Sequence, residues 1–347
     1  MMVIRPVKAS DLDGLMELAR SAGVGLTSLP VNEERLSARI ARSEKSFSGE
    51  ADLAERGYVF VLEDTASGRV GGICALEAAV GLKEPWYNYR VGTIVHASEE
   101  LDVYTRHETL FLSNDHTGYS ELCTLFLHPD FRVNKNGGLL SKSRFLFLAQ
   151  FPEMFGKVVV AEMRGVSDAA GNSPFWEALG RHFFSMEFAQ ADYLTGVGQK
   201  AFVAELMPKF PVYIDFLPQD AQAVIGQTHD NTRPAVAMLH SEGFRYEGYV
   251  DIFDAGPTVQ AYTRDIRAVR DSRLLAANVG DSADSAGSAA TGFYLVSNTG
   301  FDGFRVLLAE LAPGADSVKL SAEQAATLNI KQGDVVRVVA LSPKETA

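Results

Sequence analysis

The stretch ELCTLFLHPDFRVNKNGGLLSKSRF, residues 121–145, carries the strongest signal for the fold. Its first part, 121–127, is a near-continuous apolar run, which predicts a strand in the middle of a sheet covered on both faces. His128-Pro129-Asp130 breaks this strand, and Gly137-Gly138 precede an apolar helix over 139–151. A helix that begins after glycines directs backbone N–H groups, and the positive end of its dipole, toward a bound anion.

The turn before this helix is basic, which favours a phosphate-bearing ligand. Residues 131–144 contain no Asp or Glu and four cations: Arg132, Lys135, Lys142 and Arg144. In a chain of net charge −12 this excess predicts a pyrophosphate site. The residues expected to hold the pyrophosphate are Arg132, Lys135, Asn136, Gly137 and Gly138. An ordinary glycine turn with a solvated, basic helix start is the alternative interpretation. The Walker A loop and the G-x-G-x-x-G motif are both absent, which disfavours ATP and NAD.

The residues around this stretch predict a domain of strands and helices. The first 80 residues follow the order strand, helix, helix, strand, strand. Residues 81–118 are aromatic and polar with weak periodicity, and we expect them to form an insertion. A second buried strand is predicted at 157–163. Shorter elements then alternate with Pro and Gly: strands at 202–206 and 249–253, and helices at 175–179 and 234–241.

The composition limits the class of protein. The chain has 347 residues, 46% of them apolar and 22% charged, so it can bury a substantial core. Its acidic excess disfavours a nucleic-acid partner, and no apolar run approaches the roughly 18 residues that a membrane helix needs. The N-terminal run MMVIRP is short, and Asp11 and Asp13 follow at once, so it does not resemble a signal peptide. We therefore expect a cytoplasmic protein with no membrane association and no metal site. Its two cysteines are expected to be buried free thiols.

The chain is expected to divide into two folded parts. We assign residues 1–278 to the main domain. Residues 279–292 are assigned to a flexible linker, because every residue from 280 to 292 is Gly, Ala, Ser, Thr or Asp. Residues 293–347 form a small β-rich module, which we expect to dock on the main domain or on a partner. A chain that ends at 278 is expected to keep the ligand site.

The central stretch resembles the coenzyme A-binding motif of the GNAT acyltransferase superfamily. The resemblance rests on Leu-His-Pro-Asp-Phe-Arg at the strand end, the basic glycine turn and the Leu-Leu that opens the helix. The superfamily usually has Q/R-x-x-G-x-G/A, whereas Asn134-x-x-Gly137-x-Leu139 lacks the first basic residue and the last glycine. The resemblance implies an α/β (α+β) fold with a mixed central sheet flanked by helices.

A wider set of segments resembles the arginine N-succinyltransferase family over roughly residues 1–275. These segments are GLTSLP (25–30), GYVFVLED (57–64), PWYNYRVGT (85–93), SNDHTG (113–118), VVAEMRGV (159–166), SPFW (173–176) and YVDIFDAGPT (249–258). The resemblance implies transfer of succinyl from succinyl-CoA, a co-substrate, to the α-amino group of L-arginine, with no permanently bound cofactor. Residues 293–343 are similar to double-psi barrel-like modules.

The resemblance also implies roles for individual residues. His229, in Gly-Gln-Thr-His, matches the family's proton donor, and His116 is the second candidate. Leu125 matches the family's contact with succinyl-CoA, and at this position the backbone, not the apolar side chain, is expected to make that contact. Carboxylates would hold the acceptor's guanidinium, and the candidates are Asp115, Glu162, Asp168 and Glu205. Arg90 and Arg164 are candidates for the carboxylates of the two substrates. Cys123 as an acyl-enzyme nucleophile is disfavoured because its apolar strand would raise the pKa of the thiol.

Two classes of function remain open from the sequence. The first is an acyl-CoA-dependent amine N-acyltransferase, with arginine as the preferred acceptor and another basic amino acid such as ornithine as the alternative. The second is a non-catalytic subunit that binds coenzyme A or arginine. The sequence leaves open whether the chain forms a homo- or a hetero-oligomer.

Overall fold

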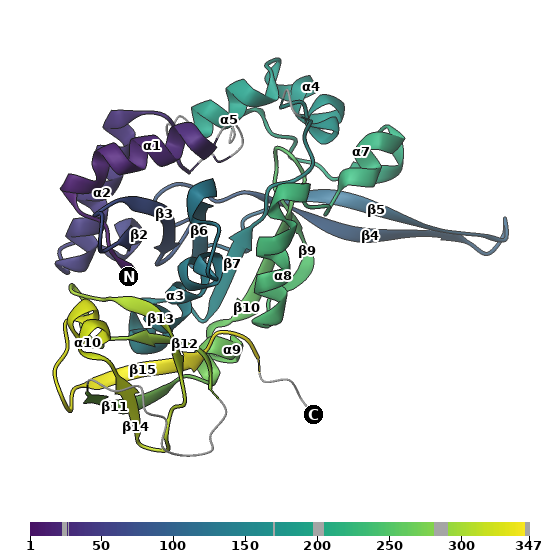
Figure 1. Ribbon diagram of the computed structural model, residues 1–347. Helices are drawn as coiled ribbons and strands as arrows, with labels where there is room; N and C mark the ends of the chain where they lie inside the picture. Colours follow the sequence, from purple (N-terminus) through teal and green to yellow (C-terminus); the bar gives the residue numbers. More distant parts are fainter. Residues whose placement is uncertain (23–25, 27, 169–170, 197–204, 281–290, 344–347) are drawn as a thin grey trace.

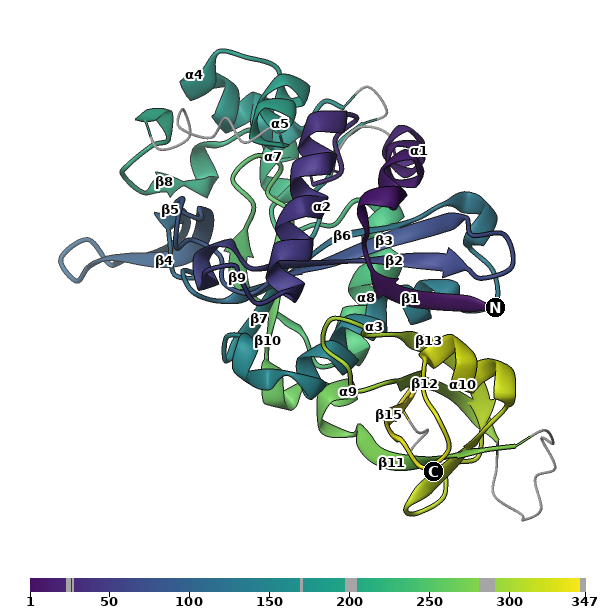
Figure 2. The same cartoon turned by 90° about the vertical axis from the view of Figure 1, so that its left-hand side faces the viewer.

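The computed structural model describes residues 1–347 except 23–25, 27, 169–170, 197–204, 281–290 and 344–347. The N-terminal elements follow the predicted order. They are β1 (Met2–Pro6), α1 (Leu12–Ala22), α2 (Glu33–Phe47), β2 (Gly57–Asp64) and β3 (Val70–Glu77). Asn32 caps α2 by accepting a hydrogen bond from the backbone N–H of Arg35 (3.0 Å). Apolar side chains of α1 and α2 pack on β2 and β3 and cover one face of the sheet (Figures 1 and 2).

The quoted central stretch forms the predicted strand, turn and helix. They are β6 (Ser120–Leu127) and α3 (Asn136–Gln150), followed by β7 (Val158–Glu162). α3 buries Leu140 and Phe147 in a second apolar core that it shares with β2, β3 and β7. β6 and β7 are parallel, whereas β3 pairs antiparallel with β6, so the sheet is mixed. The expectation of a mixed central sheet flanked by helices is confirmed.

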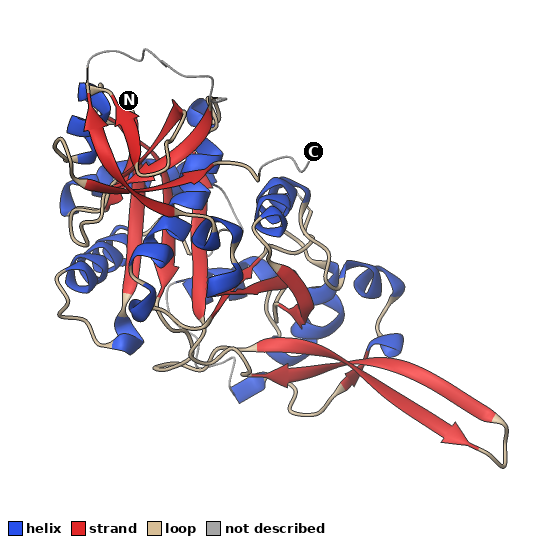
Figure 3. Cartoon of the chain, turned by 90° about the horizontal axis from the view of Figure 1, so that it is seen from below, coloured by secondary structure: helices blue, strands red, loops and turns tan. Residues whose placement is uncertain are grey.

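Within the expected insertion at 81–118, residues 88–113 form a long β-hairpin, a feature that the sequence did not predict. β4 (Asn88–Ser98) pairs with β5 (Val103–Ser113) along its whole length. The sheet continues from β7 through β10 (Pro257–Tyr262) and β9 (Arg245–Val250) to this hairpin. The tip of the hairpin extends beyond the rest of the chain (Figure 3). The base of the hairpin, around Asn88 and Ser113, therefore lies beside the ends of the central strands.

The C-terminal module continues the same sheet. Its elements are β11 (Arg273–Val279), β12 (Gly292–Ser297), β13 (Val306–Leu311), β14 (Ser317–Leu320), α10 (Ala322–Leu328) and β15 (Val335–Ala340). β11 pairs with β14 and β15, so a boundary at 278 would cut through the module's own sheet. β13 pairs with β1 at Ile4 and Val306, which joins the module to the main domain. Of the expected linker, residues 281–290 lie outside the described residues, while Val279 and Gly292 belong to strands.

The remaining elements cover the sheet or connect its strands. They are α4 (Arg181–Phe184), α5 (Phe188–Gly196), β8 (Val212–Tyr213), α7 (Gln219–Val224), α8 (Arg233–Ser241) and α9 (Arg267–Arg270). The helix expected at 234–241 is confirmed as α8. The strand expected at 202–206 is wrong at Glu205 and Leu206, which are helical, and the rest of that segment lies outside the described residues. No described helix has both the length and the apolar character needed to cross a membrane.

Candidate active site

The two central parallel strands separate soon after they begin. β6 and β7 pair only at Ser120 with Val159 and at Glu121 with Val160. β6 then continues to Leu127 while pairing with β3 alone, and β7 ends at Glu162. Within the described residues, the edge of β6 that faces β7 therefore has no strand partner beyond Glu121, as the chain approaches α3.

β6 also contains an irregularity at this point. The register against β3 shifts between Ile73 and Ala75, so that Thr124 and Leu125 together lie opposite Cys74. Such a β-bulge leaves one residue of the strand unpaired in the ladder. Thr124 has φ +51°, a left-handed conformation that is rare and strained for a β-branched residue. The expected backbone site at Leu125 thus coincides with an interrupted ladder.

The N-terminus of α3 has free donors. Lys135 precedes the helix at φ +62°, and among the described residues no side chain caps the first turn. The backbone N–H groups of Gly137 and Gly138 therefore lack intrahelical acceptors. Asn136 is buried and donates from Nδ2 to the carbonyl of Phe131 (3.1 Å), which fixes the turn. Of the expected pyrophosphate residues, Asn136 has a structural role, and the two glycines offer the backbone.

Only part of the expected basic charge lies at this turn. Arg132 and Lys135 are exposed, and the Lys135 ammonium lies 4.7 Å from the centre of the Phe293 ring in the C-terminal module. Lys142 is instead buried and paired with Glu242 (2.8 Å). Arg144 is also buried, where it donates to the carbonyls of Ser141 and Cys123, and burial lowers its pKa. The number of cations in the sequence therefore overestimates the positive charge available to a ligand, because Lys142 and Arg144 on α3 are buried inside the protein.

The glycine turn gives a direct test of the anion site. A Cβ at Gly137 would have Leu127 as its nearest neighbour at 3.9 Å, so the protein itself has room for a side chain there. We expect Gly137→Val to weaken coenzyme A binding at least ~10-fold, because the side chain obstructs approach of the pyrophosphate to the backbone. Calorimetric titration of the folded variant measures this. Lys135→Glu should weaken binding in a salt-dependent way, and Lys331→Glu, an exposed residue of the C-terminal module, is its control. Unchanged affinity in Gly137→Val would remove this turn from the site.

Several expected substrate residues converge around Asn88 at the base of the hairpin. Asn88 Oδ1 lies 2.7 Å from Nδ1 of His116 and accepts from the Trp86 indole N–H (2.9 Å). Asn88 Nδ2 donates to Oε1 of Glu162 at the end of β7 (2.7 Å). His116 is buried, and this burial lowers its pKa. His116 and Glu162 are thus brought together, by an asparagine that the sequence did not single out.

Asp115 and Arg90 complete this group. Tyr249 donates its hydroxyl to Oδ2 of Asp115 (2.7 Å), and this bond lowers the pKa of Asp115. The Arg90 guanidinium lies 3.8 Å from the same carboxylate oxygen and 5.7 Å from the centre of the Tyr249 ring. We call Arg90, Asn88, Asp115, His116, Glu162 and Tyr249 the acceptor cluster. It holds two carboxylates and one cation beside the end of β7.

His229 contacts the segment that directly follows β7. Its backbone N–H donates to the carbonyl of Arg164 (2.9 Å), two residues after Glu162. Its Nδ1 accepts from the N–H of Asn231 (3.1 Å), which leaves Nε2 as the ring nitrogen that carries the proton of the neutral imidazole. Partial burial and the charge of Arg164 lower the pKa of His229. Arg164 itself donates to the hydroxyl of Ser167 (2.8 Å).

A buried aspartate holds this strand end, and the sequence missed its role. Asp254 accepts hydrogen bonds from the N–H groups of Gly165 (2.7 Å) and Gly256 (2.8 Å). Burial and the neighbouring Asp251 raise the pKa of Asp254. A Cβ on Gly256 would lie 2.0 Å from the carbonyl oxygen of Met163, so the two segments touch through their backbones. The segment YVDIFDAGPT contains the relevant signal, an aspartate beside a glycine.

The remaining expected candidates are Asp168, Glu205 and Cys123. Asp168 accepts from the backbone and side chain of Asn172, and Glu205 is exposed on a helical turn. Burial raises the pKa of the Cys123 thiol to about 12, which agrees with its exclusion as a nucleophile. Within the part of the chain that the structure describes, His, Cys, Asp and Glu side chains form no group that could hold a metal ion.

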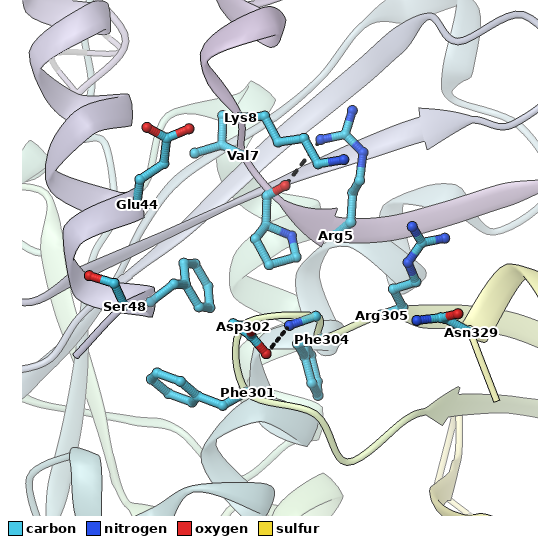
Figure 4. Close-up of a pocket in the computed structure, with 13 residues that line it drawn as sticks. Arg5, Val7, Lys8, Glu44, Ser48, Phe301, Asp302, Phe304, Arg305 and Asn329 are labelled. Carbon is cyan, nitrogen blue, oxygen red and sulfur yellow. Dashed lines mark hydrogen bonds between the residues drawn. The ribbon is translucent and has the colours of Figure 1, made fainter.

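A cavity of about 540 Å³ lies elsewhere, between the main domain and the C-terminal module (Figure 4). Arg5, Lys8 and Glu44 line one side, and Phe301, Asp302 and Arg305 line the other. Arg5 is already paired with Asp11 (2.7 Å). None of the site residues expected from the sequence lines this cavity.

Comparison with known proteins places the chain in a family. A family model described as arginine N-succinyltransferase beta subunit matches residues 2–268, and the model of that subunit's C-terminal domain matches 279–340. The chain is 57% identical to arginine N-succinyltransferase of Enterobacter sp. (strain 638), over 99% of each chain. It is 55% identical to the enzyme of Yersinia pseudotuberculosis serotype O:3 (strain YPIII), over 100% of this chain and 99% of the relative.

A solved structure shares the whole architecture. Arginine/ornithine succinyltransferase subunit AI from Pseudomonas aeruginosa is 38% identical, with a TM-score of 0.90 over 99% of both chains. The interrupted strand, the uncapped glycine turn and the histidine beside β7 thus occur in a chain whose full length aligns with these proteins. On these grounds, the chain belongs to the arginine N-succinyltransferase family.

Proposed function

We propose that this chain transfers the succinyl group of succinyl-CoA to the α-amino group of L-arginine, which yields N2-succinyl-L-arginine and coenzyme A. The observation that carries the proposal is the bulged strand β6, which separates from β7 and leads into the free N-terminus of α3. The full-length family match supports the same reaction. No permanently bound group is proposed, because succinyl-CoA serves as a co-substrate. The free cysteines suit the reducing cytoplasm.

The acyl donor would lie along β6. The pyrophosphate would accept hydrogen bonds from the N–H groups of Gly137 and Gly138, with Arg132 and Lys135 adding charge. The thioester carbonyl would accept from the backbone N–H of Leu125 in the bulge. That bond strengthens as the carbonyl oxygen becomes an oxyanion in the tetrahedral adduct, so it lowers the barrier.

The acceptor would lie between the acceptor cluster and His229. Asp115 and Glu162 supply the negative charge that a guanidinium requires, and Arg90 and Arg164 supply cations for the α-carboxylate. The neutral amine attacks the thioester carbon and the carbon–sulfur bond breaks. His229 passes its Nε2 proton to the departing sulfur in the same step in which the ring takes up the proton that the amine loses, so no imidazolate anion forms. The number of protons is therefore conserved.

Two alternatives make different predictions. The Pseudomonas aeruginosa protein is named for both arginine and ornithine, and an ornithine ammonium would also suit the two carboxylates. A non-catalytic subunit would bind coenzyme A without turnover. The same Pseudomonas protein is named as a subunit, so assembly with further chains is part of the proposal.

Thiol release by the purified full chain separates these functions. With succinyl-CoA and arginine we expect free thiol and a product with the mass of succinylarginine in equal amounts. Ornithine and acetyl-CoA are the comparison substrates. Absence of arginine-dependent thiol release would favour the non-catalytic subunit, and faster turnover of ornithine would reassign the acceptor.

The proposed role of His229 predicts an acidic limit to activity. Protonation of Nδ1 replaces an acceptor with a donor that faces the N–H of Asn231, so the ring loses its orientation. We expect kcat to fall as the pH drops through a pKa below about 6.5, the ordinary value for histidine. Arg164→Gln removes a charge that lowers this pKa, so the acidic limb should move to higher pH, whereas Arg164→Lys should leave it in place. If the acidic fall of kcat occurs at the same pH in Arg164→Gln as in the wild type, this fall is not due to His229.

A further inference from the structure

Arg39, on α2, reaches the bulge of β6 from the face that α1 and α2 cover. One terminal nitrogen of its guanidinium donates to Oγ1 of Thr124 (2.6 Å) and lies 3.6 Å from Sγ of Cys123. The other terminal nitrogen donates to the carbonyl of Ser28. The guanidinium is therefore placed beside the residue that immediately precedes Leu125.

The charge of Arg39 is poorly compensated within the described residues. Its side chain is 16% exposed, and the carboxylate found nearest to it, Glu77, lies 4.0 Å away. Glu77 is hydrogen-bonded to Arg42 instead. Arg39 Nε is buried and has no hydrogen-bond partner in the described part of the chain. A largely buried cation whose carboxylate partner is 4.0 Å away and already hydrogen-bonded to another arginine is incompletely compensated, and a bound anion would relieve that cost.

The acyl group of the proposed donor carries such an anion. In succinyl-CoA, two methylene groups separate the thioester carbonyl from a free carboxylate. With the carbonyl at the N–H of Leu125, that short chain ends near Thr124, where Arg39 lies. We propose that Arg39 binds the distal carboxylate of the succinyl group and so selects a dicarboxylic acyl donor. This inference rests on the proposed function.

The other cations of this region are less suited to the role. Arg144 approaches the same strand from α3, but its donors are directed to Ser141 and to the carbonyl of Cys123. Arg42 is more exposed, at 38%, and is paired with Glu77. Arg90 and Arg164 lie at the acceptor end of the site. The assignment of the succinyl carboxylate to Arg39 leaves these two arginines for the carboxylate of the amino acid.

The test compares two acyl donors of equal chain length in the full chain. Butyryl-CoA carries a methyl group where succinyl-CoA carries the carboxylate. For Arg39→Gln we expect kcat/KM for succinyl-CoA to fall roughly 10- to 100-fold, the effect of one lost charge-assisted hydrogen bond, while the value for butyryl-CoA stays the same or rises. Arg39→Lys, which keeps a point charge, should recover part of the loss. Arg20→Gln, at an exposed arginine in the last turn of α1, is the matched control and should change the ratio of the two donors little.

The possible failures are distinguishable. If the wild-type chain releases no thiol from succinyl-CoA with arginine, the proposed function is wrong. If the wild-type chain is active and Arg39→Gln loses both donors equally, Arg39 is only structural and this inference is overturned. If Arg39→Gln does not fold, Arg39→Lys gives the same comparison. An equal loss of kcat/KM for succinyl-CoA and butyryl-CoA in Arg39→Lys would also overturn the inference.

Discussion

Replacement of His229 by alanine is expected to lower kcat by roughly 10²- to 10⁴-fold, with little change in the affinity for succinyl-CoA. The expected loss is large because the thiolate then leaves without a proton donor. The affinity should persist because the donor site is built from β6 and α3, whereas His229 lies on the loop that contacts Arg164. Steady-state thiol release and calorimetric binding of coenzyme A measure the two quantities separately.

The control for this variant is His240→Ala. His240 is exposed near the end of α8, where its ring contacts the carbonyl of Phe244 (2.9 Å). Its loss should leave kcat nearly unchanged. Turnover close to wild type in His229→Ala would reject the proton-donor role, and His116, whose ring lies in the acceptor cluster, would then be the next residue to replace.

Replacement of Glu242 by glutamine is expected to destabilise the fold by about 3–5 kcal/mol. Glu242 is fully buried and accepts from Lys142 (2.8 Å), Arg267 (2.6 Å) and the N–H of Ala268 (2.8 Å). Without its charge, two buried cations lose their common partner. The same two cations donate to the carbonyls of Ala340 and Leu341, so the end of β15 should loosen as well.

Urea denaturation of the full chain measures this effect. Glu55→Gln is the control, because Glu55 pairs with Lys83 on the surface and its loss should not shift the transition measurably. A transition of Glu242→Gln that coincides with that of the wild type would show that the buried group does not stabilise the fold.

Local signals allowed much of the fold to be predicted from the sequence. The apolar run at 121–127 and the glycines before α3 each act over a few residues, and each formed the expected element. The family resemblance also identified Asp115, His116 and Glu162 as candidates, and the structure places them together in the acceptor cluster. Their contact depends on Asn88, which is 74 residues from Glu162, and no local pattern encodes that pairing.

The features that were missed depend on tertiary packing. Glu121–Leu127 has the composition of a regular strand, yet Thr124 adopts φ +51° because the register against β3 shifts there. Lys142 and Arg144 were counted as ligand-facing charges, but Lys142 is directed to Glu242 and Leu341, far along the chain, and Arg144 to the carbonyl of Cys123 in β6. β11 lies before the glycine-rich segment and yet pairs with strands that follow it.

The most direct test of the account is where succinyl-CoA binds. Hydrogen–deuterium exchange of the full chain, with and without succinyl-CoA and in the absence of arginine, reports this segment by segment. We expect slower exchange in peptides that cover β6 at 122–127 and the first turn of α3 at 136–140, and no change around residues 301–305. Protection confined to residues 5–8 and 301–305, which line the cavity between the main domain and the C-terminal module, would contradict a donor site on β6.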